Sequence, residues 1–595
     1  MNLISNRMHT SLYFTAILGM ALIVFVLFSN VTESASKEGL PEAEDDTELL
    51  NLQLLTITDF HGYLNDTSQI NTPEGPKTVG GAAYIAAHLD RLEKSDSPTI
   101  RLSAGDDFSG WPFEVASFRD EPTIEFLNAI DLDLSVAGNH EFDISKDFLK
   151  KHMMDGKCFG VIGMDSCFED STGQQFQGAD YEYLSANIRD AQSGKLVLKP
   201  YIIKEIPDGQ GGTVPVGFIG LTTTTTILGT TSFQEGDLTA DELLESGNRY
   251  AKELQDLGVE TIIAVVHEGG ADNGDNEKCL NTGPVIDFAK EASPAIDAIV
   301  TGHWHATFNC SIDDPDGNPR PIIEGANHGK YVSEVNLWID PASQDVVREK
   351  TTSANHPVTR DIEPDPEIAK LASYWKTRGE QRWAEPVAKL TGDLTRARNA
   401  NGESTLANFV ADSHYATGQT GRKKPADFAL TAASSLKGDL LYKKGTNAAD
   451  KDGQILFGEQ WAAHGYDNPI VNVTLTGAQI EQILEEQWRQ SPNGVVTFHP
   501  LATSYNVRYS YDDSKTVGDR VDPENVYIDN KRLNPKRSYR VAALAYLIRG
   551  NDGYPTFLEY ENPVRIENDH WAFYAYLKQQ KTIAPPELNR VTKLN

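Results

Sequence analysis

The chain has 595 residues, of which 39% are hydrophobic and 9% aromatic, and its formal net charge at pH 7 is −33. This composition excludes a wholly disordered protein, and the length predicts two domains rather than one. The strong negative charge argues against a nucleic-acid polymer or an anionic membrane surface as the partner.

The amino-terminal end has the features of an export signal. Arg7 and His9 precede an apolar stretch at residues 12–28, and small residues follow at 34–36. The stretch is also long enough for an uncleaved membrane anchor, and this alternative stays open. Residues 1–36 are therefore expected to be a signal peptide or an anchor. Both readings place the folded part outside the cytoplasm, as a secreted, periplasmic or surface-anchored protein.

Strand-like apolar runs alternate with helical segments from residue 50 to residue 361. The expected strands are 52–57, 99–102, 132–137, 216–221, 261–266 and 298–301, and the expected helices are 82–94, 122–129, 240–257 and 285–292. Such alternation predicts a layered α/β domain over residues 50–361.

The pattern changes after a predicted linker helix at residues 362–385. Helices are expected at 405–417 and 477–490, and strands at 426–431, 471–475, 505–511 and 539–544. These elements predict a second α/β domain over residues 386–590, without the polar motifs that follow the strands of the first domain.

Five of the expected strands in the first domain end in residues that hold divalent metals. The motifs are Thr-Asp59-Phe-His61-Gly, Ala-Gly-Asp106-Asp107-Phe, Gly-Asn139-His140-Glu141-Phe-Asp143, Val-Val-His267-Glu268 and Gly-His303-Trp-His305. Open α/β sheets place their sites at the carboxyl ends of strands, so these side chains are expected to converge on one crevice.

The residue types in these motifs suit a pair of metal ions. By position they divide into one set of Asp59, His61 and Asp106 and another of Asn139, His267 and His303, with Asp106 the best placed to bridge. Carboxylate, amide and imidazole ligands without thiolates suit Zn, Mn, Fe or Co, and the sequence does not choose among them. Two ions roughly 3.5–4 Å apart activate a shared water and clamp a phosphoryl oxygen.

His140 is left over for catalysis, because the neighbouring Asn139 already supplies a ligand. Asp143, three residues further along, can fix the tautomer of His140 and favour its cation. A cationic imidazole beside the metals would stabilise charge on the phosphoryl oxygens or protonate the leaving oxygen.

Together the five motifs resemble those of the calcineurin-like metallophosphoesterases. The form of Gly138–Asp143, followed by a second domain, is similar to the 5′-nucleotidase branch of that superfamily. The resemblance implies a four-layer α/β domain, a β-sandwich flanked by helices, and a carboxyl-terminal α/β substrate domain. It also implies that His140 and Asp143 form the catalytic dyad. The implied ligand sets are Asp59, His61, Asp106 and His305 for one metal, and Asp106, Asn139, His267 and His303 for the other.

The second domain keeps part of the family's nucleoside-binding frame. The segments at 402–408, 473–477 and 550–555 resemble blocks of the 5′-nucleotidase substrate domain. By this resemblance Asp552 accepts hydrogen bonds from ribose hydroxyls, and Tyr546 provides one of two rings that stack on the base.

Other positions depart from the family. Asparagine and arginine of its N-G-G-G-I-R block are replaced by Ala432 and Lys437, and a lysine keeps the charge but loses the bidentate fork. The second stacking ring falls near residues 464–467, where His464 or Tyr466 could take its place. Lys437 and His464 therefore join Tyr546 and Asp552 as candidate substrate-binding residues.

Several polar residues near the motifs are interpreted as structural. Asp107 is expected to be a turn residue or to lie behind the ligands. Glu141 and Glu268 are expected to support the fold, and His88 and His328 are expected not to bind metal.

Four cysteines fit an exported chain. Two disulfides, Cys158–Cys167 and Cys279–Cys310, are expected, although four cysteines permit three connectivities. Four inert buried thiols are the alternative.

By resemblance, the chain is expected to be an exported metal-dependent phosphoric ester hydrolase of 5′-nucleotidase type. Its expected reaction converts nucleoside 5′-monophosphates to nucleoside and phosphate by a metal-bridging hydroxide. UDP-sugars and 2′,3′-cyclic nucleotides are further candidate substrates. The alternatives are a phosphoesterase for a non-nucleotide substrate and a surface binding protein with a residual enzymatic frame. The sequence leaves the oligomeric state open.

Overall fold

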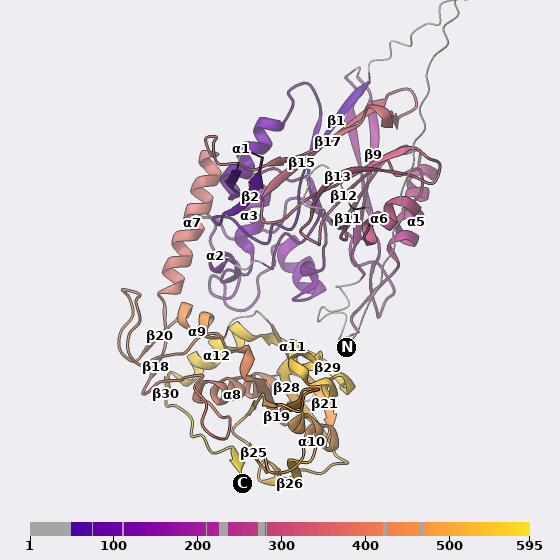
Figure 1. The fold of residues 1–595 in the computed structure, drawn as a ribbon. Helices are drawn as coiled ribbons and strands as arrows, with labels where there is room; N and C mark the ends of the chain where they lie inside the picture. The colour runs from indigo at the N-terminus through magenta and orange to yellow at the C-terminus, as the bar shows by residue number, and fades with distance from the viewer. Residues whose placement is uncertain are drawn as a thin grey trace, which may run out of the picture. The chain divides into compact units, whose positions relative to one another are not determined.

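The computed structural model describes residues 49–594 except 74, 110–111, 210, 225–235, 272–279, 281, 421–424 and 465–467. The described chain forms two α/β domains joined through one long helix, α7 (Pro366–Trp383) (Figure 1). The predicted signal or anchor, residues 1–36, lies outside the described residues. Within the part that is described, no helix has both the length and the hydrophobicity that crossing a bilayer requires.

One sheet of the first domain contains the strands that precede the first three motifs. Its order is β16 (Asp345–Val346), β15 (Tyr331–Asp340), β1 (Leu50–Ile57), β4 (Thr99–Ser103), β5 (Leu134–Val136) and β6 (Glu182–Leu184), with β17 (Thr352–Pro357) also paired to β15. β4 pairs in parallel with both β1 and β5, so the carboxyl ends of these three strands lie at the same edge.

A second sheet contains the strands that precede the other two motifs. Its order is β13 (Thr307–Asp313), β14 (Pro319–Gly325), β12 (Ala298–Thr301), β11 (Thr261–His267), β9 (Thr213–Thr222) and β8 (Tyr201–Pro207). β9, β11, β12 and β14 run in parallel. Every residue of β11 and β12 is buried, as expected for parallel strands covered on both faces.

The two sheets pack face to face, and helices cover their outer faces. The core between the sheets includes Leu54 and Leu102 from one sheet and Phe218 and Val265 from the other. Figure 1 shows the helices on opposite sides of this sandwich: α1 (Ala82–Leu92), α3 (Glu121–Ala129) and α7 on one side, α5 (Leu243–Asp256) and α6 (Pro284–Glu291) on the other. The predicted four-layer α/β fold is confirmed.

The second domain is built on smaller sheets. A five-stranded sheet has the order β24 (Leu501–Thr503), β19 (Phe428–Ala432), β28 (Ser538–Leu544), β21 (Pro469–Thr476) and β29 (Glu561–Asn568). The domain also contains a four-stranded sheet of β27 (Lys531–Arg532), β26 (Val521–Ile528), β25 (Val507–Tyr511) and β31 (Val591–Lys593), and a three-stranded sheet of β20 (Gln454–Leu456), β18 (Pro386–Leu390) and β30 (Thr582–Ile583). Its main helices are α8 (Thr405–Gln419), α9 (Phe457–Ala463), α10 (Gly477–Glu485), α11 (Ala545–Ile548) and α12 (Asp569–Gln580).

One predicted helix is too long. The segment expected to be helical through residue 490 leaves the helix at Glu485, and β22 (Trp488–Gln490) pairs with β23 (Val496–Phe498). The Trp488 and Phe498 rings face each other across this pair with centroids 4.9 Å apart. Such cross-strand aromatic packing stabilises the hairpin over a continued helix.

The disulfide Cys158–Cys167 forms as predicted. Cys310 is also disulfide-bonded, and Cys279, its predicted partner, lies outside the described residues.

Candidate metal centre and ligand pocket

The first group of candidate ligands consists of Asp59, His61 and His305. One ligand atom from each lies within 4.8 Å of the others. Asp59 and His61 directly follow β1, and His305 follows β12. His305 Nε2 is 3.4 Å from Asp59 Oδ1. Two separate motifs of the sequence thus meet in one cluster.

The second group consists of Asp106, His267 and His303, whose ligand atoms also lie within 4.8 Å of one another. Asp106 follows β4, His267 ends β11 and His303 follows β12. His267 Nε2 is 3.0 Å from Asp106 Oδ2. Carboxyl ends of strands from both sheets supply these side chains.

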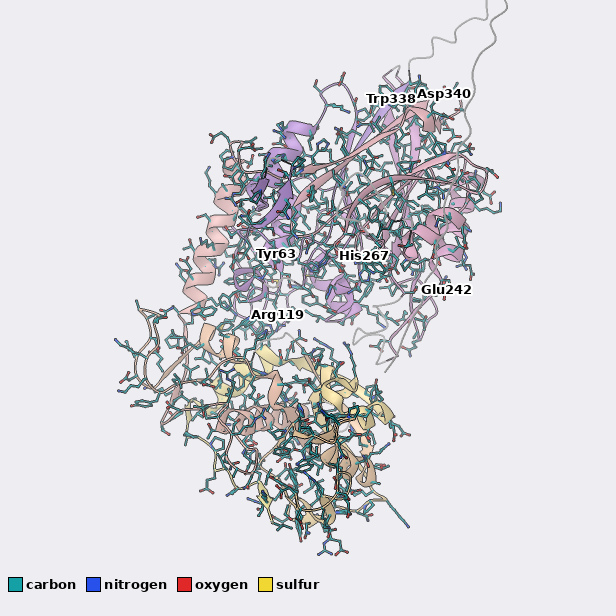
Figure 2. All side chains as sticks on the ribbon, in the orientation of Figure 1. Tyr63, Arg119, Glu242, His267, Trp338 and Asp340 are labelled. Atoms are coloured by element: carbon teal, nitrogen blue, oxygen red, sulfur yellow. A yellow bond between two sulfur atoms is a disulfide. The ribbon has the colours of Figure 1, made fainter. Side chains whose placement is uncertain are left out.

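The two groups are neighbours. His303 of the second group donates its backbone N–H to Asp59 Oδ2 of the first group at 3.0 Å. Asn139 lies between Gly138, which packs against Asp106, and His140, whose backbone N–H donates to Asp106 Oδ1 at 2.9 Å. The structure therefore brings all seven predicted metal ligands to one region. Figure 2 labels His267 in this region and shows Trp338 and Asp340 at the far end of the domain.

The backbone at these ligands is strained. Five of the seven have left-handed φ angles between 48° and 84°: Asp59, His61, Asp106, His303 and His305. Residues other than glycine rarely adopt this conformation, and it persists only where the surroundings impose it. This strain is what we expect where the backbone must adopt an unfavourable conformation to direct the ligand side chains into the site.

The tautomers of two histidines fit metal binding. His267 Nδ1 donates to the Ala104 carbonyl at 2.7 Å, which directs Nε2 at the Asp106 carboxylate. His61 Nδ1 donates to the Phe108 carbonyl at 3.3 Å in the same way. An outer hydrogen bond that leaves the other nitrogen free is typical of metal-ligating histidine.

The electrostatics of the site are strongly polarised. Burial disfavours the charged form of Asp106, yet His267 and His140 outweigh burial and hold its pKa well below the usual range. Burial also opposes the cation of His267, but the Asp106 carboxylate raises the pKa of His267 to about 10. Burial lowers the pKa of His61 to about 4. Shifts of opposite sign in adjacent groups are typical of functional sites.

His140 and Asp143 form the predicted pair. His140 begins a short 3-10 helix, and its Nδ1 is 2.6 Å from Asp143 Oδ2. Burial opposes the cation of His140, but Asp143 and Asp106 raise its pKa to about 10. The imidazole ring is 5.2 Å from that of His61, so a cationic group faces the metal ligands.

Sequence reasoning did not identify Ser109, whose hydroxyl donates to Asp143 Oδ2 at 2.9 Å and fixes the carboxylate. It also missed Asn327, whose amide nitrogen is 2.9 Å from His305 Nδ1. Neither residue lies in a metal-binding motif, so no signal of residue type marked them.

The residues interpreted as structural have clear partners. Asp107 is buried and accepts hydrogen bonds from Ser135 at 2.7 Å and Tyr183 at 3.1 Å. Glu268 accepts from Thr223 at 2.8 Å. The ring of His328 stacks on Tyr63 with centroids 3.6 Å apart, outside both metal groups. Its backbone N–H donates to the Asp59 carbonyl at 2.8 Å. His88 bonds to the Thr359 carbonyl at 3.0 Å.

The second domain contains a pocket of about 350 Å³ beside β19 and α11. Its lining comprises Ala432, Ser434, Ser435, Asn468, Leu544, Tyr546, Leu547 and Asp552. Tyr546 is 48% exposed, so one ring face is available to a ligand. Ser434 donates its hydroxyl to Asp552 Oδ2, and Asn468 Oδ1 accepts from the Tyr546 backbone N–H at 2.9 Å. The predicted Tyr546 and Asp552 thus share one pocket.

Two other predicted substrate residues are not in its lining. His464 is completely buried, and its Nε2 is 3.1 Å from His414 Nε2, so it presents no ring face for stacking. The Lys437 side chain is exposed outside the lining, and its backbone carbonyl accepts from Arg396. Tyr466, the alternative stacking residue, lies outside the described residues.

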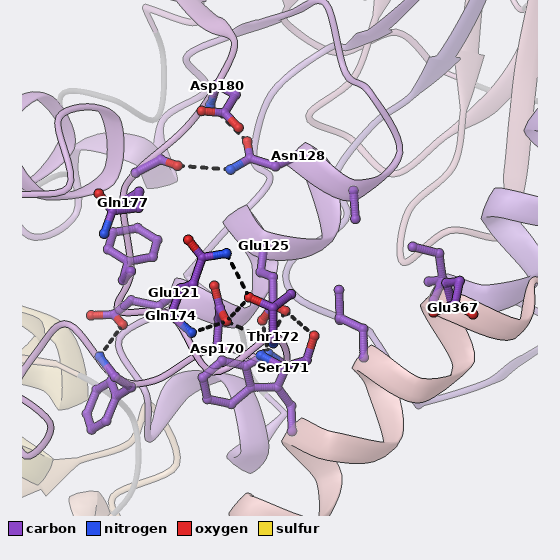
Figure 3. Close-up of a pocket in the computed structure, with 17 residues that line it drawn as sticks. Glu121, Glu125, Asn128, Asp170, Ser171, Thr172, Gln174, Gln177, Asp180 and Glu367 are labelled. Atoms are coloured by element: carbon purple, nitrogen blue, oxygen red, sulfur yellow. Dashed lines mark hydrogen bonds between the residues drawn. The ribbon is translucent and has the colours of Figure 1, made fainter.

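A further pocket, of about 460 Å³, lies between α3 and α7 and contains none of the predicted site residues (Figure 3). Glu125 is held there by Ser171 N at 3.0 Å and by the Trp375 indole N–H at 2.5 Å. Glu121 accepts from the backbone N–H groups of Cys167 and Phe168 at 2.6 and 2.8 Å. Glu121 thus supports the disulfide-bonded Cys167, and Glu125 joins Ser171 to α7.

Comparisons with known proteins agree with this arrangement. The family model for calcineurin-like phosphoesterases matches residues 52–307, and the model for the 5′-nucleotidase C-terminal domain matches residues 386–559. A cell wall protein of Listeria monocytogenes is 26% identical over 95% of this chain and 70% of its own length. A 2′,3′-cyclic-nucleotide 2′-phosphodiesterase/3′-nucleotidase of Yersinia enterocolitica is 23% identical over 90% of this chain and 84% of its own.

The solved structures support the fold. The NAD nucleotidase of Haemophilus influenzae is similar with a TM-score of 0.55 at 20% identity, covering 91% of this chain and 99% of that one. A 5′-nucleotidase-like protein of Staphylococcus aureus has a TM-score of 0.53 at 18% identity, with 91% and 99% covered.

Proposed function

The chain belongs to the 5′-nucleotidase branch of the calcineurin-like phosphoesterases, and on this premise we propose that it hydrolyses nucleoside 5′-monophosphates outside the cell. That it is a phosphoester hydrolase follows from its relatives. The observation that carries the finer proposal is the pairing of two adjacent ligand groups with the His140–Asp143 dyad in one site.

The ligand groups suit two divalent ions. Asp59, His61 and His305 would hold one and Asp106, His267, His303 and Asn139 the other, with Asp106 proposed to bridge. When bound, such ions lower the pKa of coordinated water and polarise a phosphoryl oxygen. The mixture of imidazole and carboxylate ligands supports Zn, Mn, Fe or Co, and their identity and number are part of the proposal.

The role proposed for His140 is to act on the phosphoryl group as a cation. Nδ1 donates to Asp143, and the nearby Asp143 and Asp106 carboxylates favour the cation, in which Nε2 also carries a proton. Nε2–H can then stabilise negative charge on a phosphoryl oxygen or transfer its proton to the leaving oxygen. Ser109 fixes Asp143 and thereby the direction of the imidazole.

The nucleoside is proposed to bind in the second-domain pocket. The exposed face of Tyr546 can stack on a base, and Asp552 can accept hydrogen bonds from ribose hydroxyls. Leu544 and Leu547 supply apolar wall. Lys437 and His464, given their positions, are not retained in the proposed pocket.

Export is proposed from the apolar segment at residues 12–28 and is supported by the cell wall location in the name of the Listeria relative. The boundaries 50–361, 362–385 and 386–590 are likewise proposed, and the two family matches fall within the first and third.

The proposal is tested by measuring phosphate release from a substrate panel with metal-loaded protein. AMP and other nucleoside monophosphates should be hydrolysed with the highest kcat/KM. UDP-sugars and 2′,3′-cyclic nucleotides should follow. Equal or better turnover of sugar phosphates than of AMP would overturn the nucleotide preference.

A non-nucleotide phosphoester is the second candidate, and the pocket supplies the observation that favours it. Among the described residues that line it, Tyr546 is the one aromatic ring and Asp552 the one charged side chain. A substrate held by one ring and one carboxylate need not be a nucleotide. The same panel separates the two candidates.

A further inference from the structure

Glu141 is completely buried, and its carboxylate accepts hydrogen bonds from the backbone of two loops that carry metal-ligand candidates. Oε2 accepts from Gly138 N at 2.7 Å and from Asp106 N at 3.1 Å, and Oε1 accepts from Asp107 N at 2.9 Å. One carboxylate thus joins the loop after β4, which carries Asp106, to the loop after β5, which carries Asn139.

The contact between these loops is tight. A Cβ atom added to Gly138 would lie 2.2 Å from Asp106 Oδ1 and 2.8 Å from His267 Nε2. Asp106 also holds a left-handed φ of 52°, which its surroundings must impose. Because Glu141 receives the Asp106 and Asp107 N–H groups together, it restrains the peptide units on both sides of this strained residue.

We propose that Glu141 is a positioning residue that sets the distance and orientation between Asp106 and Asn139, and so the affinity of the second ligand group for metal. Glu141 points at backbone amides and supplies no ligand atom to either group. The inference rests on the metal site of the proposed function but not on the identity of the substrate.

The chain offers a matched control in Glu121, which Figure 3 labels. Glu121 is 1% exposed and also accepts two backbone N–H groups, those of Cys167 and Phe168. It lies in the pocket between α3 and α7, away from the ligand motifs. If Glu141 were merely a buried carboxylate of the fold, the two residues would respond alike to the same substitution.

The test compares Glu141→Gln with Glu121→Gln by titrating metal-free protein with Zn²⁺ and with Mn²⁺ in a calorimeter. Glutamine keeps the shape but turns one amide N–H₂ group toward a backbone N–H. Glu141→Gln should weaken metal binding by roughly 10- to 100-fold, the usual effect of losing an outer-shell partner. The ion held with Asn139 should be affected more than the ion held with His305.

Glu121→Gln should lower the melting temperature of the metal-free protein and leave both metal affinities unchanged. Unchanged metal affinity in Glu141→Gln, or an equal loss in Glu121→Gln, would overturn the proposal. If Glu141→Gln does not fold, Glu141→Asp, which withdraws the carboxylate by one methylene, is measured under the same criteria.

The outcomes for function and positioning are distinguishable. A wild-type chain that binds metal but does not hydrolyse nucleotides would refute the proposed substrate. The metal affinities of Glu141→Gln and Glu121→Gln would still decide the role of Glu141. A wild-type chain that binds neither metal would refute both.

Discussion

The two proposed sites of this molecule are built in opposite ways. The metal centre gathers buried carboxylates and imidazoles at strand ends, and five of its seven residues have left-handed backbone angles. The second-domain pocket has apolar walls, a half-exposed tyrosine and Asp552 as the one charge among its described lining residues. The buried carboxylates of the metal centre suit a bound cation. The pocket instead suits a ligand that makes apolar contacts and a few hydrogen bonds.

This difference indicates a division of roles. Buried charges must be held rigidly, because an unpaired charge in an apolar interior is costly. In the first domain that rigidity comes from hydrogen bonds that the Glu141 and Asp107 carboxylates accept and from the one that Ser109 donates to Asp143. A substitution in a recognition pocket leaves no buried charge unpaired and therefore destabilises the protein less. Departures from the family pattern such as Ala432 are for this reason expected in the pocket rather than at the metal site.

The largest effect is expected from removing the charge of the bridging candidate. Asp106→Asn keeps the size of the side chain but leaves His267 Nε2 without its carboxylate neighbour. Phosphate release should fall to background, and metal content measured by mass spectrometry should fall with it. Asp340→Asn, at the far end of the same domain (Figure 2), should change neither quantity.

The next largest effect is expected at the dyad. His140→Ala should lower kcat by on the order of 10²-fold, because it removes a positioned general acid while leaving the seven ligands in place. The measurement is steady-state turnover at saturating substrate with metal content held equal. His88→Gln, a change at a buried histidine outside both ligand groups, should leave kcat unchanged. An unaltered kcat in His140→Ala would refute its assigned role.

A third expectation concerns pH and the second domain. Burial lowers the pKa of His464 and of His570 to about 3, and burial lowers that of His414 well below its usual value. The unfolded chain takes up these protons below pH 6.5 while the folded chain stays neutral. Stability is therefore present above that pH and is lost toward pH 3, by up to about 1.4 kcal/mol per pH unit for each histidine.

Urea unfolding at pH 7.5, 6.0 and 5.0 measures this loss. His464→Gln removes one of these histidines and should make the loss of stability toward low pH shallower. If wild type and variant lose stability in parallel, His464 does not titrate as its burial requires.

The smallest effect is expected at the recognition pocket. Tyr546→Ala should raise the KM for AMP by roughly 2- to 10-fold, which corresponds to the usual contribution of one aromatic pair. It should leave kcat/KM unchanged for a small phosphoester without a nucleoside. Tyr505→Ala serves as the control, because Tyr505 is 58% exposed and lies outside the pocket lining. An equal loss of kcat/KM for AMP and for the small phosphoester would mean that Tyr546 stabilises the fold rather than binding the nucleoside.

The metal residues could be predicted because the chemistry restricts the residue types and the strand ends bring them together. The strands expected at 298–301 and 261–266 match β12 and β11 closely, so His267, His303 and His305 were placed correctly relative to the sheet. The sequence predicts a structural role for Glu141 but not its hydrogen bonds to Asp106, Asp107 and Gly138, because these partners are backbone groups that no pattern of side chains reveals.

The pocket was harder to predict. Ser434 and Asn468 belong to it through contacts with Asp552 and with the backbone of Tyr546, which are 118 and 78 residues away in sequence. His464 was chosen by its position in a segment that departs from the family, but its ring packs inward against His414. The end of α10 was missed because the Trp488–Phe498 contact depends on a hairpin partner rather than on local helix propensity.

Phosphate release measured against added metal is the most direct test of the central claim, that the seven ligands hold two ions that drive phosphoester hydrolysis. Metal-free protein should be inactive toward AMP, and its rate should rise with added Zn²⁺ or Mn²⁺ until two equivalents per chain are bound. Full activity in the metal-free protein, or saturation without any bound metal, would contradict this account.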